Sequence, residues 1–349
     1  MTLKPFELKD SPSLIENLFP VQKISIESFK EQMAGSGKTL TALGNYWKGR
    51  KPLILNKACI LGALLPCSEN PVKDLEIFEL LMGMHNSSVS IRLGRIKPNE
   101  VVSKKGNIKI SKYFDIKVNL PKGWVVEKMP ELPEKTVVDY KLYKAIIKNI
   151  KTGETKEASI DFVWKKDITE IEKLELEAQA LPEDIYKDNI SLKTCKRPEE
   201  LGDNVYEHIW EKVNNHLNTN AHSIPELIEQ LGIARFGHKP KVADVFSGSG
   251  QIPFEAARLG CDVYASDLNP IACLLTWADF NIVGTDIVTK NKYAEERKAI
   301  ISKIQNQIDD LKIDEVKENI QVEDCKKYES EYDFYVCSFK FFNVFKGYE

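Results

Sequence analysis

The segment that most constrains the fold is residues 241–267, "KVADVFSGSGQIPFEAARLGCDVYASD". An apolar run ending near Asp244 predicts a buried strand, and the glycine-rich turn "SGSG" follows it directly. "IPFEAARLG" predicts a helix that ends at Gly260, and "CDVYASD" predicts a second strand. A strand, a helix and a strand in this order make one βαβ unit, which implies a parallel sheet with a right-handed crossover. The fold class is therefore predicted to be α/β in this part of the chain.

The same segment carries a candidate ligand site. Gly248 and Gly250 let a ligand approach the backbone where a Cβ would block it. Pro253 replaces the third glycine of a dinucleotide-binding loop, which argues against a dinucleotide oxidoreductase. Asp267, at the end of the second predicted strand, could accept both ribose hydroxyls, and Asp244 could reach a charged amino-acid portion. The residues suit S-adenosylmethionine, which has an adenosine and a cationic tail; the alternative is a structural turn whose aspartate caps the next helix.

A second glycine-rich stretch, "AGSGKTLTAL" at residues 34–43, has the Gly-Lys-Thr of a nucleotide-triphosphate loop. Such a loop needs a glycine five residues before the final Gly-Lys and must follow a buried strand. The glycine position holds Gln32, and "SIESFKEQM" before it has a helical period. No hydrophobic strand ending in Asp stands out at a suitable distance to serve as a Walker B partner. ATP binding is therefore not expected.

The stretch "YWKGRKPL" that follows has two interpretations. It is either a connector with a solvated basic face, or a segment whose aromatic rings stack on bases while its cations contact phosphates. The net charge of -3, from 49 basic and 52 acidic residues, neither supports nor excludes DNA as a partner. The candidate DNA-binding residues are Tyr46, Trp47, Lys48, Arg50 and Lys51.

The pattern along the 349 residues predicts three blocks. Residues 1–115 are mainly helical, with helices over "SPSLIENLF", "ISIESFKEQM", "LILNKACILGALLP" and "VKDLEIFELLMGM". Residues 116–200 form an insert with a β-hairpin around Thr152-Gly153. The segments on either side, "LPKGWVVEKMPELPEK" and "KKDITEIEKLELEAQALPEDIYKDN", are expected to be connectors or an inserted module. Residues 201–349 begin with helices over "VYEHIWEKVNNHL" and "SIPELIEQLG", the second capped by Ser223.

Cysteine usage and hydropathy bear on the location of the protein. The seven cysteines are scattered, with no C-x-x-C pair and no Cys/His cluster at zinc spacing, so we expect reduced thiols and no metal site. The amino terminus lacks a signal-peptide pattern, and no run approaches the roughly 20 apolar residues of a membrane span. A cytoplasmic protein without a membrane partner is predicted.

Two long segments resemble one protein family. "VADVFSGSGQIPFEAARLGCDVYASDLNPIACLLTWADFNIVG", with "NTNAHSIPELIEQLG" and "ARFGHKP" upstream, resembles the cofactor half of large adenine-specific DNA methylases. "LIENLFPVQKISIESFKEQMAGSGKTLTALGNYWKGRKPLILNKACILGALLP" is similar to the uncharacterised domain that opens those proteins. The resemblance covers roughly residues 15–85 and 197–290, in the family's order. It implies that the apparent nucleotide-triphosphate loop is a family segment of another kind.

The resemblance implies a Rossmann-like class I S-adenosylmethionine-dependent methyltransferase fold over residues 201–349. The implied reaction is methyl transfer to the exocyclic amino nitrogen of adenine in DNA, with the base swung out of the duplex. The family associates with modification and phage-defence systems, whose other proteins are further expected partners. By position, Asp267 would hold the ribose, and the rest of the cofactor site would be Asp244, Phe246, Ser247, Gly248, Gly250 and Asn269.

The chain departs from the family at the catalytic motif. Amino-methylases hold the target base with an (Asp/Asn/Ser)-Pro-Pro-(Tyr/Phe) tetrapeptide after a later strand, and this sequence has no Pro-Pro dipeptide. In "YDFYVCSFKF" the residues Asp333–Cys337 predict a strand, so Ser338-Phe339 are the weak catalytic candidates. Relatives are longer, and the resemblance ends near Gln321. We therefore expect an amino-terminal portion with an incomplete sheet, in which "DFYVCSFKFFNVF" would be aggregation-prone if unpaired.

Two alternative functions remain open. The chain could bind DNA or S-adenosylmethionine without turnover, as a component of a modification or defence system. A cytosine carbon-5 methylase also uses a loop like "DVFSGSG" and attacks through a Pro-Cys pair. Pro66-Cys67 is such a pair, but it precedes the glycine turn and lies at a helix end, so both its order and its context fit poorly.

Overall fold

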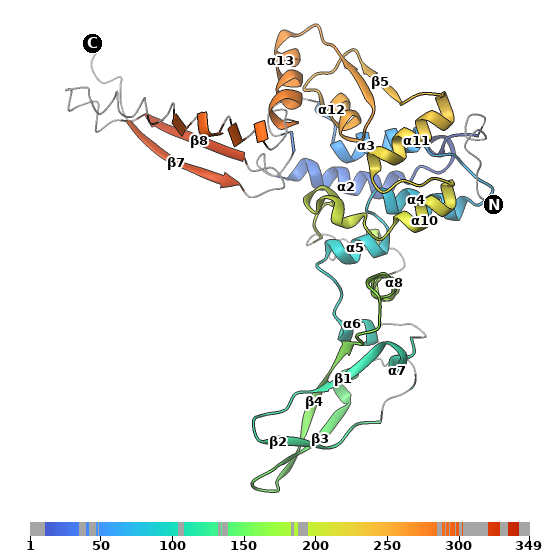
Figure 1. Ribbon diagram of the computed structural model, residues 1–349, viewed down its shortest axis with the longest axis vertical. Coiled ribbons are helices and arrows are strands. Elements are labelled where there is room, and N and C mark those ends of the chain that lie inside the picture. Colours follow the sequence, from blue (N-terminus) through green and yellow to red (C-terminus); the bar gives the residue numbers. More distant parts are fainter. Residues whose placement is uncertain are drawn as a thin grey trace. The chain divides into compact units, whose positions relative to one another are not determined.

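The computed structural model describes most of the chain as mixed helix and sheet (Figure 1). The backbone alone is described for residues 203–204, 320–328 and 334–341. Within the described residues, no helix combines the length and apolar character that crossing a lipid bilayer requires. The described residues are 11–34, 40–41, 47, 49–103, 108–131, 134, 139–182, 185–187, 195–284, 288–289, 291–292, 294–296, 298–299, 302, 320–328 and 334–341.

The chain divides into two compact units, each made of three stretches of sequence. Unit 1 takes in residues 1–34, 51–242 and 255–264. Unit 2 takes in residues 35–50, 243–254 and 265–349. The block boundaries predicted at residues 115 and 200 stay predictions.

The helices of unit 1 confirm most of the helical predictions, because their ends carry local signals. The Glu16 carboxylate accepts hydrogen bonds from both the backbone N and Oγ of Ser13 at the start of the first helix. Ser223 caps the last helix, which ends at Gly237 with φ +77. These helices are α1 (Leu14–Asn17), α2 (Val21–Met33), α3 (Leu53–Leu64), α4 (Pro71–Leu81), α5 (Asn86–Arg92), α6 (Pro98–Ser103), α7 (Ile110–Tyr113), α8 (Glu170–Ala180), α10 (Trp210–Leu217) and α11 (Ile224–Phe236).

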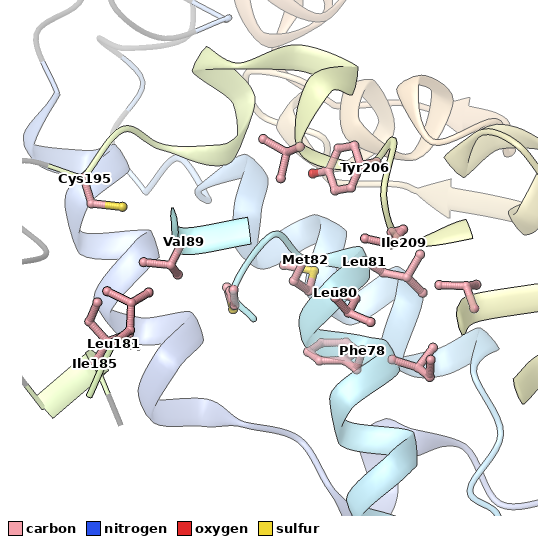
Figure 2. Close-up of a cluster of buried hydrophobic side chains, with 14 of the residues drawn as sticks. Phe78, Leu80, Leu81, Met82, Val89, Leu181, Ile185, Cys195, Tyr206 and Ile209 are labelled. Atoms are coloured by element: carbon pink, nitrogen blue, oxygen red, sulfur yellow. The ribbon is translucent and has the colours of Figure 1, made fainter. Parts of the chain in front are cut away.

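The apolar core of unit 1 is built around α4. Phe78 and Leu81 have no exposed surface, and Leu80 is 1% exposed. Figure 2 shows Val89, Leu181, Ile185, Cys195, Tyr206 and Ile209 around the same cluster. Burying one such large apolar side chain contributes roughly 1.5 to 3 kcal/mol. The core therefore joins helices from both halves of the sequence.

The predicted hairpin around Thr152-Gly153 is present as β3 (Lys144–Asn149) and β4 (Thr155–Trp164), and Gly153 has φ +72. These strands belong to an antiparallel sheet in the order β1-β4-β3-β2, with β1 at Phe114–Val118 and β2 at Trp124–Lys128. Along β3 the buried Ala145 and Ile147 alternate with exposed residues, so one face of the sheet is packed.

Three local predictions were wrong. "LPKGWVVEKMPELPEK" contains β2, and "KKDITEIEKLELEAQALPEDIYKDN" contains α8, so the interpretation of these two segments as connectors is wrong, whereas the alternative of an inserted module stays open. The α8 helix forms because Thr169 and Glu172 make a capping box and because Leu174 is buried. In "VYEHIWEKVNNHL" the predicted helix is shorter than expected, because α10 begins only at Trp210.

Short 3-10 helical turns also lie at η4 (Tyr140–Leu142), η5 (Ile185–Lys187), η6 (Pro198–Glu200) and η7 (Gly202–Val205).

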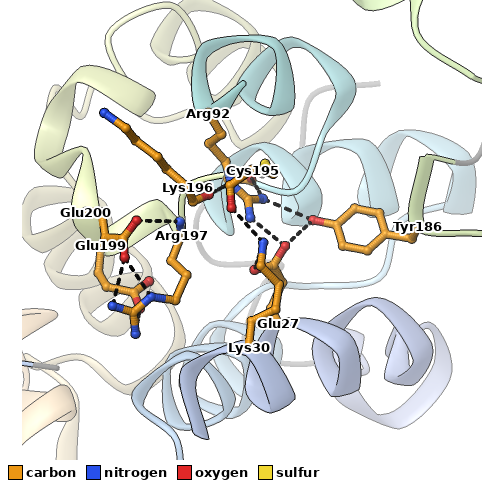
Figure 3. A network of polar contacts seen from close by, with 10 residues as sticks. Glu27, Lys30, Arg92, Tyr186, Cys195, Lys196, Arg197, Glu199 and Glu200 are labelled. Atoms are coloured by element: carbon orange, nitrogen blue, oxygen red, sulfur yellow. Dashed lines mark hydrogen bonds and ion pairs between the residues drawn. The ribbon is translucent and has the colours of Figure 1, made fainter. Parts of the chain in front are cut away.

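A buried ion-pair network crosses unit 1 (Figure 3). Arg92 Nη2 donates to Glu27 Oε1 at 2.6 Å, and Tyr186 OH donates to the same oxygen at 2.9 Å. Arg92 and Glu27 are each 1% exposed. The network joins α2, α5 and η5, so it ties together segments that are far apart in the sequence.

The predicted βαβ unit consists of β5 (Lys241–Asp244), α12 (Gln251–Arg258) and β6 (Asp262–Ala265), with Gly260 at φ +97 after the helix. The backbone N of Asp262 donates to Pro240 O, and that of Ser266 donates to Asp244 O, both at 2.9 Å. Both partners advance by four residues, so the two strands run parallel, as predicted. The prediction that the first strand is buried was wrong, because Lys241 and Ala243 are exposed and Val242 and Asp244 are half-buried. The chain then continues into α13 (Pro270–Ala278) and a π-helical turn, η8 (Asp279–Val283).

The last two described strands form a separate antiparallel pair, β7 (Ile320–Tyr328) and β8 (Phe334–Phe341). The strand was predicted to end at Cys337, but β8 continues through Ser338 and Phe339, which pair with Glu323 and Val322. Asp333 lies outside the described residues. β8 is paired with β7, so the unpaired state in which this segment was expected to aggregate is not the one observed.

Candidate functional site

The glycine turn after β5 adopts a conformation that favours glycine. Gly248 has φ +53 and Gly250 has φ +78, values that side chains with a Cβ rarely adopt. The backbone N of Ser247 donates to Ser266 O at 3.0 Å, and the backbone N of Gly250 donates to Ser247 O at 2.8 Å. The turn is therefore anchored both to itself and to the chain beyond β6.

Protein atoms lie close to both glycines. A Cβ on Gly248 would lie 2.6 Å from Trp47 Nε1, and a Cβ on Gly250 would lie 2.9 Å from the Cα of Thr276. In the structure, the indole of Trp47 therefore lies in the space beside Gly248, and the backbone of α13 lies in the space beside Gly250. A ligand at Gly248 has either to share this surface with Trp47 or to displace the indole. Contact of the turn with a ligand stays a prediction.

Asp267 lies at the turn, beyond the carboxyl end of β6. Its Oδ1 accepts a hydrogen bond from Asn269 N and its Oδ2 accepts one from Gly248 N, both at 2.8 Å. The hydrogen bond from Asn269, followed by that from Gly248, holds the pKa of Asp267 below its ordinary value. A carboxylate offers about four lone-pair sites, so each oxygen can accept a further donor. The structure thus brings Gly248, Asp267 and Asn269 together.

The N-cap of α13 is Asn269, whose Oδ1 accepts a hydrogen bond from Ile271 N at 3.0 Å. The alternative in which Asp267 caps this helix is therefore wrong in detail. Asp267 instead bonds the backbone of the cap residue and of the glycine turn. Its carboxylate links the ends of the two parallel strands.

The remaining predicted cofactor residues lie on the first half of the turn. Asp244 Oδ1 accepts a hydrogen bond from Phe246 N at 3.1 Å. The Phe246 ring is exposed, with 75% of the residue's surface accessible, whereas Ser247 is buried and its Oγ lies 3.2 Å from Thr276 Oγ1. Phe246 therefore offers an apolar surface beside the turn, and Ser247 has a packing role.

The structure divides the predicted DNA-binding residues. Tyr46 and Lys48 lie outside the described residues. The Trp47 indole lies at Gly248, Arg50 is half-buried, and Lys51 is exposed. Arg50 and Trp47 are also joined by a hydrogen bond from the Arg50 backbone N to Trp47 O at 3.2 Å. Two of the three described residues thus belong to the surroundings of the glycine turn, and their contact with DNA stays a prediction.

A buried polar cluster beside the turn was not predicted from the sequence. Thr41 Oγ1 donates to Gln251 Oε1, and Gln251 Nε2 donates to Ser249 O at 3.2 Å and to Asp279 Oδ2 at 3.3 Å. Burial raises the pKa of Asp279 to about 7, against the charge of Arg50 and the hydrogen bond from Gln251. The one feature of the sequence that could have indicated this cluster is a lone acidic residue, Asp279, after the apolar run "IACLLTWA".

The structure also bears on two other motifs. The helix α2 precedes the apparent nucleotide-triphosphate loop, as expected, and residues 35–39 of that loop lie outside the described residues. The Cys67 thiol donates to Ser13 O at 3.5 Å, and burial raises the pKa of Cys67. A nucleophilic cysteine needs a lowered pKa, so this environment does not favour the cytosine carbon-5 mechanism.

Comparison with known families gives one match. A family described as a protein of unknown function (DUF1156) matches residues 18–81, which include α2, α3 and α4. No curated protein and no solved structure matches the chain. The match overlaps the segment that resembles the uncharacterised opening domain, and its description names no activity.

Proposed function

We propose that the glycine turn binds S-adenosylmethionine, and that the chain serves methylation of the exocyclic amino group of adenine in DNA through a Rossmann-like class I methyltransferase fold. The observation that carries the proposal is the hydrogen bond from Gly248 N to the Asp267 carboxylate. It joins the carboxyl ends of two parallel strands. In open α/β sheets, ligands bind in the crevice outside the carboxyl ends of the strands.

The residues present fit the chemistry of this cofactor. The backbone hydrogen bonds of Asp267 favour its ionised form, and its remaining lone pairs can accept ribose hydroxyls. Asp244 adds a second carboxylate for the cationic part of the ligand, and the exposed Phe246 can stack on adenine. Two carboxylates and an aromatic ring around a glycine turn suit a cationic nucleoside better than they suit a polyphosphate.

Isothermal titration of the full chain with S-adenosylmethionine tests this assignment. Asp267→Asn removes the charge and leaves a side chain of the same shape, so we expect it to weaken binding by about 1 to 3 kcal/mol. Asp262→Asn is the matched control, because Asp262 is an exposed carboxylate on β6 that forms an ion pair with Lys239 at 3.7 Å. We expect this control to bind as the wild type does. Equal affinity of Asp267→Asn and wild type would exclude Asp267 as a cofactor ligand.

A second candidate function is binding of S-adenosylmethionine or DNA without methyl transfer, as a component of a modification or defence system. It is favoured by the position of Ser338 and Phe339 inside a paired strand, where they do not follow a strand end as a catalytic tetrapeptide would. A tritiated-methyl assay on unmethylated DNA separates the two functions. Transfer would exclude the second candidate, and binding without transfer would favour it. Absence of any binding heat with folded protein would contradict the cofactor assignment in both.

A further inference from the structure

The buried cluster beside the glycine turn contains two opposite charges with unmatched atoms. Asp279 has no exposed surface, and its Oδ1 has no hydrogen-bond partner in the described part of the chain. Arg50 Nη1 is also buried and without a partner there. Both residues belong to unit 2, and the charge of Arg50 acts on the Asp279 carboxyl. Buried polar atoms are rarely left without a partner, so this pair calls for an explanation.

Two arrangements relieve the unmatched carboxylate oxygen, and each excludes the other. In the first, Asp279 takes up a proton and becomes neutral, which removes its attraction for the guanidinium of Arg50. In the second, Asp279 is ionised and Arg50 Nη1 moves to bond Oδ1. Burial raises the pKa of Asp279 to about 7, so both forms are populated near neutral pH. The pair is thus able to exist in two states.

The position of Trp47 depends on the same pair. The Arg50 backbone N donates to Trp47 O at 3.2 Å, and the Trp47 indole lies against Gly248. Thr41, which precedes Trp47 in the chain, is held by Gln251, and Gln251 also bonds Asp279. The backbone of Arg50 is thus bonded directly to the residue that covers the glycine turn, which gives a route by which a movement of Arg50 could reach Trp47.

We propose that Asp279 and Arg50 form a proton-controlled latch that sets the position of the Trp47 indole over Gly248. When Asp279 is ionised, Arg50 is drawn in and the indole moves with it; when Asp279 is protonated, Arg50 is released. Of the described residues, Arg50 is the charged group that acts on Asp279, and the hydrogen-bond donor to Asp279 is the neutral amide of Gln251. Asp279 begins the π-helical turn η8, a type of irregularity that is frequent at functional sites.

Tryptophan emission tests the latch without any ligand, so its outcome is independent of the proposed cofactor. The signal of Trp47 is obtained as the difference between the wild type and Trp47→Phe, recorded between about pH 5.5 and 8.5. We expect a single transition with a midpoint near 7. Asp279→Asn, which is neutral at every pH, and Arg50→Met, which has no charge to be drawn in, should each abolish the transition. Lys51→Met is the matched control, because Lys51 is the exposed cation next to Arg50, and it should leave the transition unchanged.

Circular dichroism shows which variants fold. Arg50→Met leaves Asp279 able to become neutral, so it carries the test alone if Asp279→Asn fails to fold. A flat Trp47 signal in the wild type over this pH range would overturn the latch. Persistence of the transition in a folded Asp279→Asn or Arg50→Met protein would overturn it equally.

Discussion

Each of the two units places a buried carboxylate near an arginine, and the two pairs differ in the contacts that their charges make. In unit 1, Arg92 donates to Glu27, to Lys196 O at 2.7 Å, to Gly83 O at 2.9 Å and to Tyr186 OH at 3.1 Å (Figure 3). Glu27 Oε2 has no hydrogen-bond partner among the described residues, but it forms an ion pair with Lys30 Nζ at 3.5 Å. In unit 2, a nitrogen of Arg50 and an oxygen of Asp279 are buried without hydrogen-bond partners among the described residues.

The pKa values of the two carboxyl groups are shifted in opposite directions. Burial works to raise the pKa of Glu27, but the charges of Arg92 and Lys30 outweigh it and lower the pKa below the ordinary value. Burial raises the pKa of Asp279 to about 7, because Arg50 and Gln251 do not offset it. Similar burial thus gives an ionised carboxylate in one unit and a titratable carboxyl in the other. Each carboxylate has one oxygen without a hydrogen-bond partner, so the difference comes from the ion pairs of Glu27 with Arg92 and Lys30, which hold Glu27 in its ionised form.

The largest expected effect comes from breaking the ion pair between Arg92 and Glu27 in unit 1. Arg92→Met leaves the Glu27 carboxylate buried without its main charged partner, so we expect a loss of about 3 to 5 kcal/mol in the free energy of unfolding. Urea denaturation followed by circular dichroism measures it. Lys148→Met is the control, because the ion pair of Lys148 with Glu127, at 3.4 Å, is exposed and should contribute less than about 1 kcal/mol. Equal losses of unfolding free energy in the two variants would mean that the buried Arg92 network stabilises the protein no more than an exposed ion pair does.

Removing the carboxylate of the Arg50–Asp279 pair in unit 2 is expected to raise the stability of the protein. The pKa of Asp279 rises from 3.8 to about 7 on folding, so its stabilising contribution is full below pH 3.8 and is lost as the pH rises through 7. Asp279→Asn removes this loss, and we expect it to stabilise the protein by about 1 to 3 kcal/mol at pH 8. The gain should shrink as the pH falls toward about 4. Urea denaturation at several pH values checks this, and a variant that is less stable than the wild type at pH 8 would contradict the comparison.

The parts of the fold that were predicted correctly are those with local signals. Ser223 before α11 and Gly260 after α12 mark helix ends, and Gly248 and Gly250 occupy the left-handed positions of the turn. The helix α8 had a visible signal as well, since Thr169 stands three residues before Glu172. It was missed because a charged segment was interpreted as a connector.

The contacts that define the two buried pairs had no such signal. Thr41 bonds Gln251 across 210 residues of sequence, and Arg92 bonds Glu27 across 65. Trp47 was a candidate for DNA contact because an aromatic ring beside cations is typical of an exposed binding segment, and a connector was the alternative. Its place against Gly248 follows from the folded backbone, which brings distant segments together in a way that residue spacing does not encode.

The smallest expected effect concerns His208 in unit 1. It tests whether a buried atom without a hydrogen-bond partner also makes the stability of this unit depend on pH. His208 Nε2 lies 2.9 Å from Ser87 Oγ, while its buried Nδ1 has no partner among the residues that the structure describes. Burial lowers the pKa of His208 to about 4 from 6.5, so its contribution to stability is present above pH 6.5 and is lost as the pH falls toward 4. His208→Gln cannot take up this proton and should lessen the loss of stability between about pH 7 and 5 by about 1 to 2 kcal/mol, as measured by urea denaturation. The exposed His222, changed to Gln, is the control and should leave that loss as it is. If His208→Gln and the wild type lose the same stability between these pH values, the unmatched nitrogen of His208 does not make unit 1 sensitive to pH. If the variant loses less, unmatched buried atoms produce pH sensitivity in unit 1 as well as in unit 2.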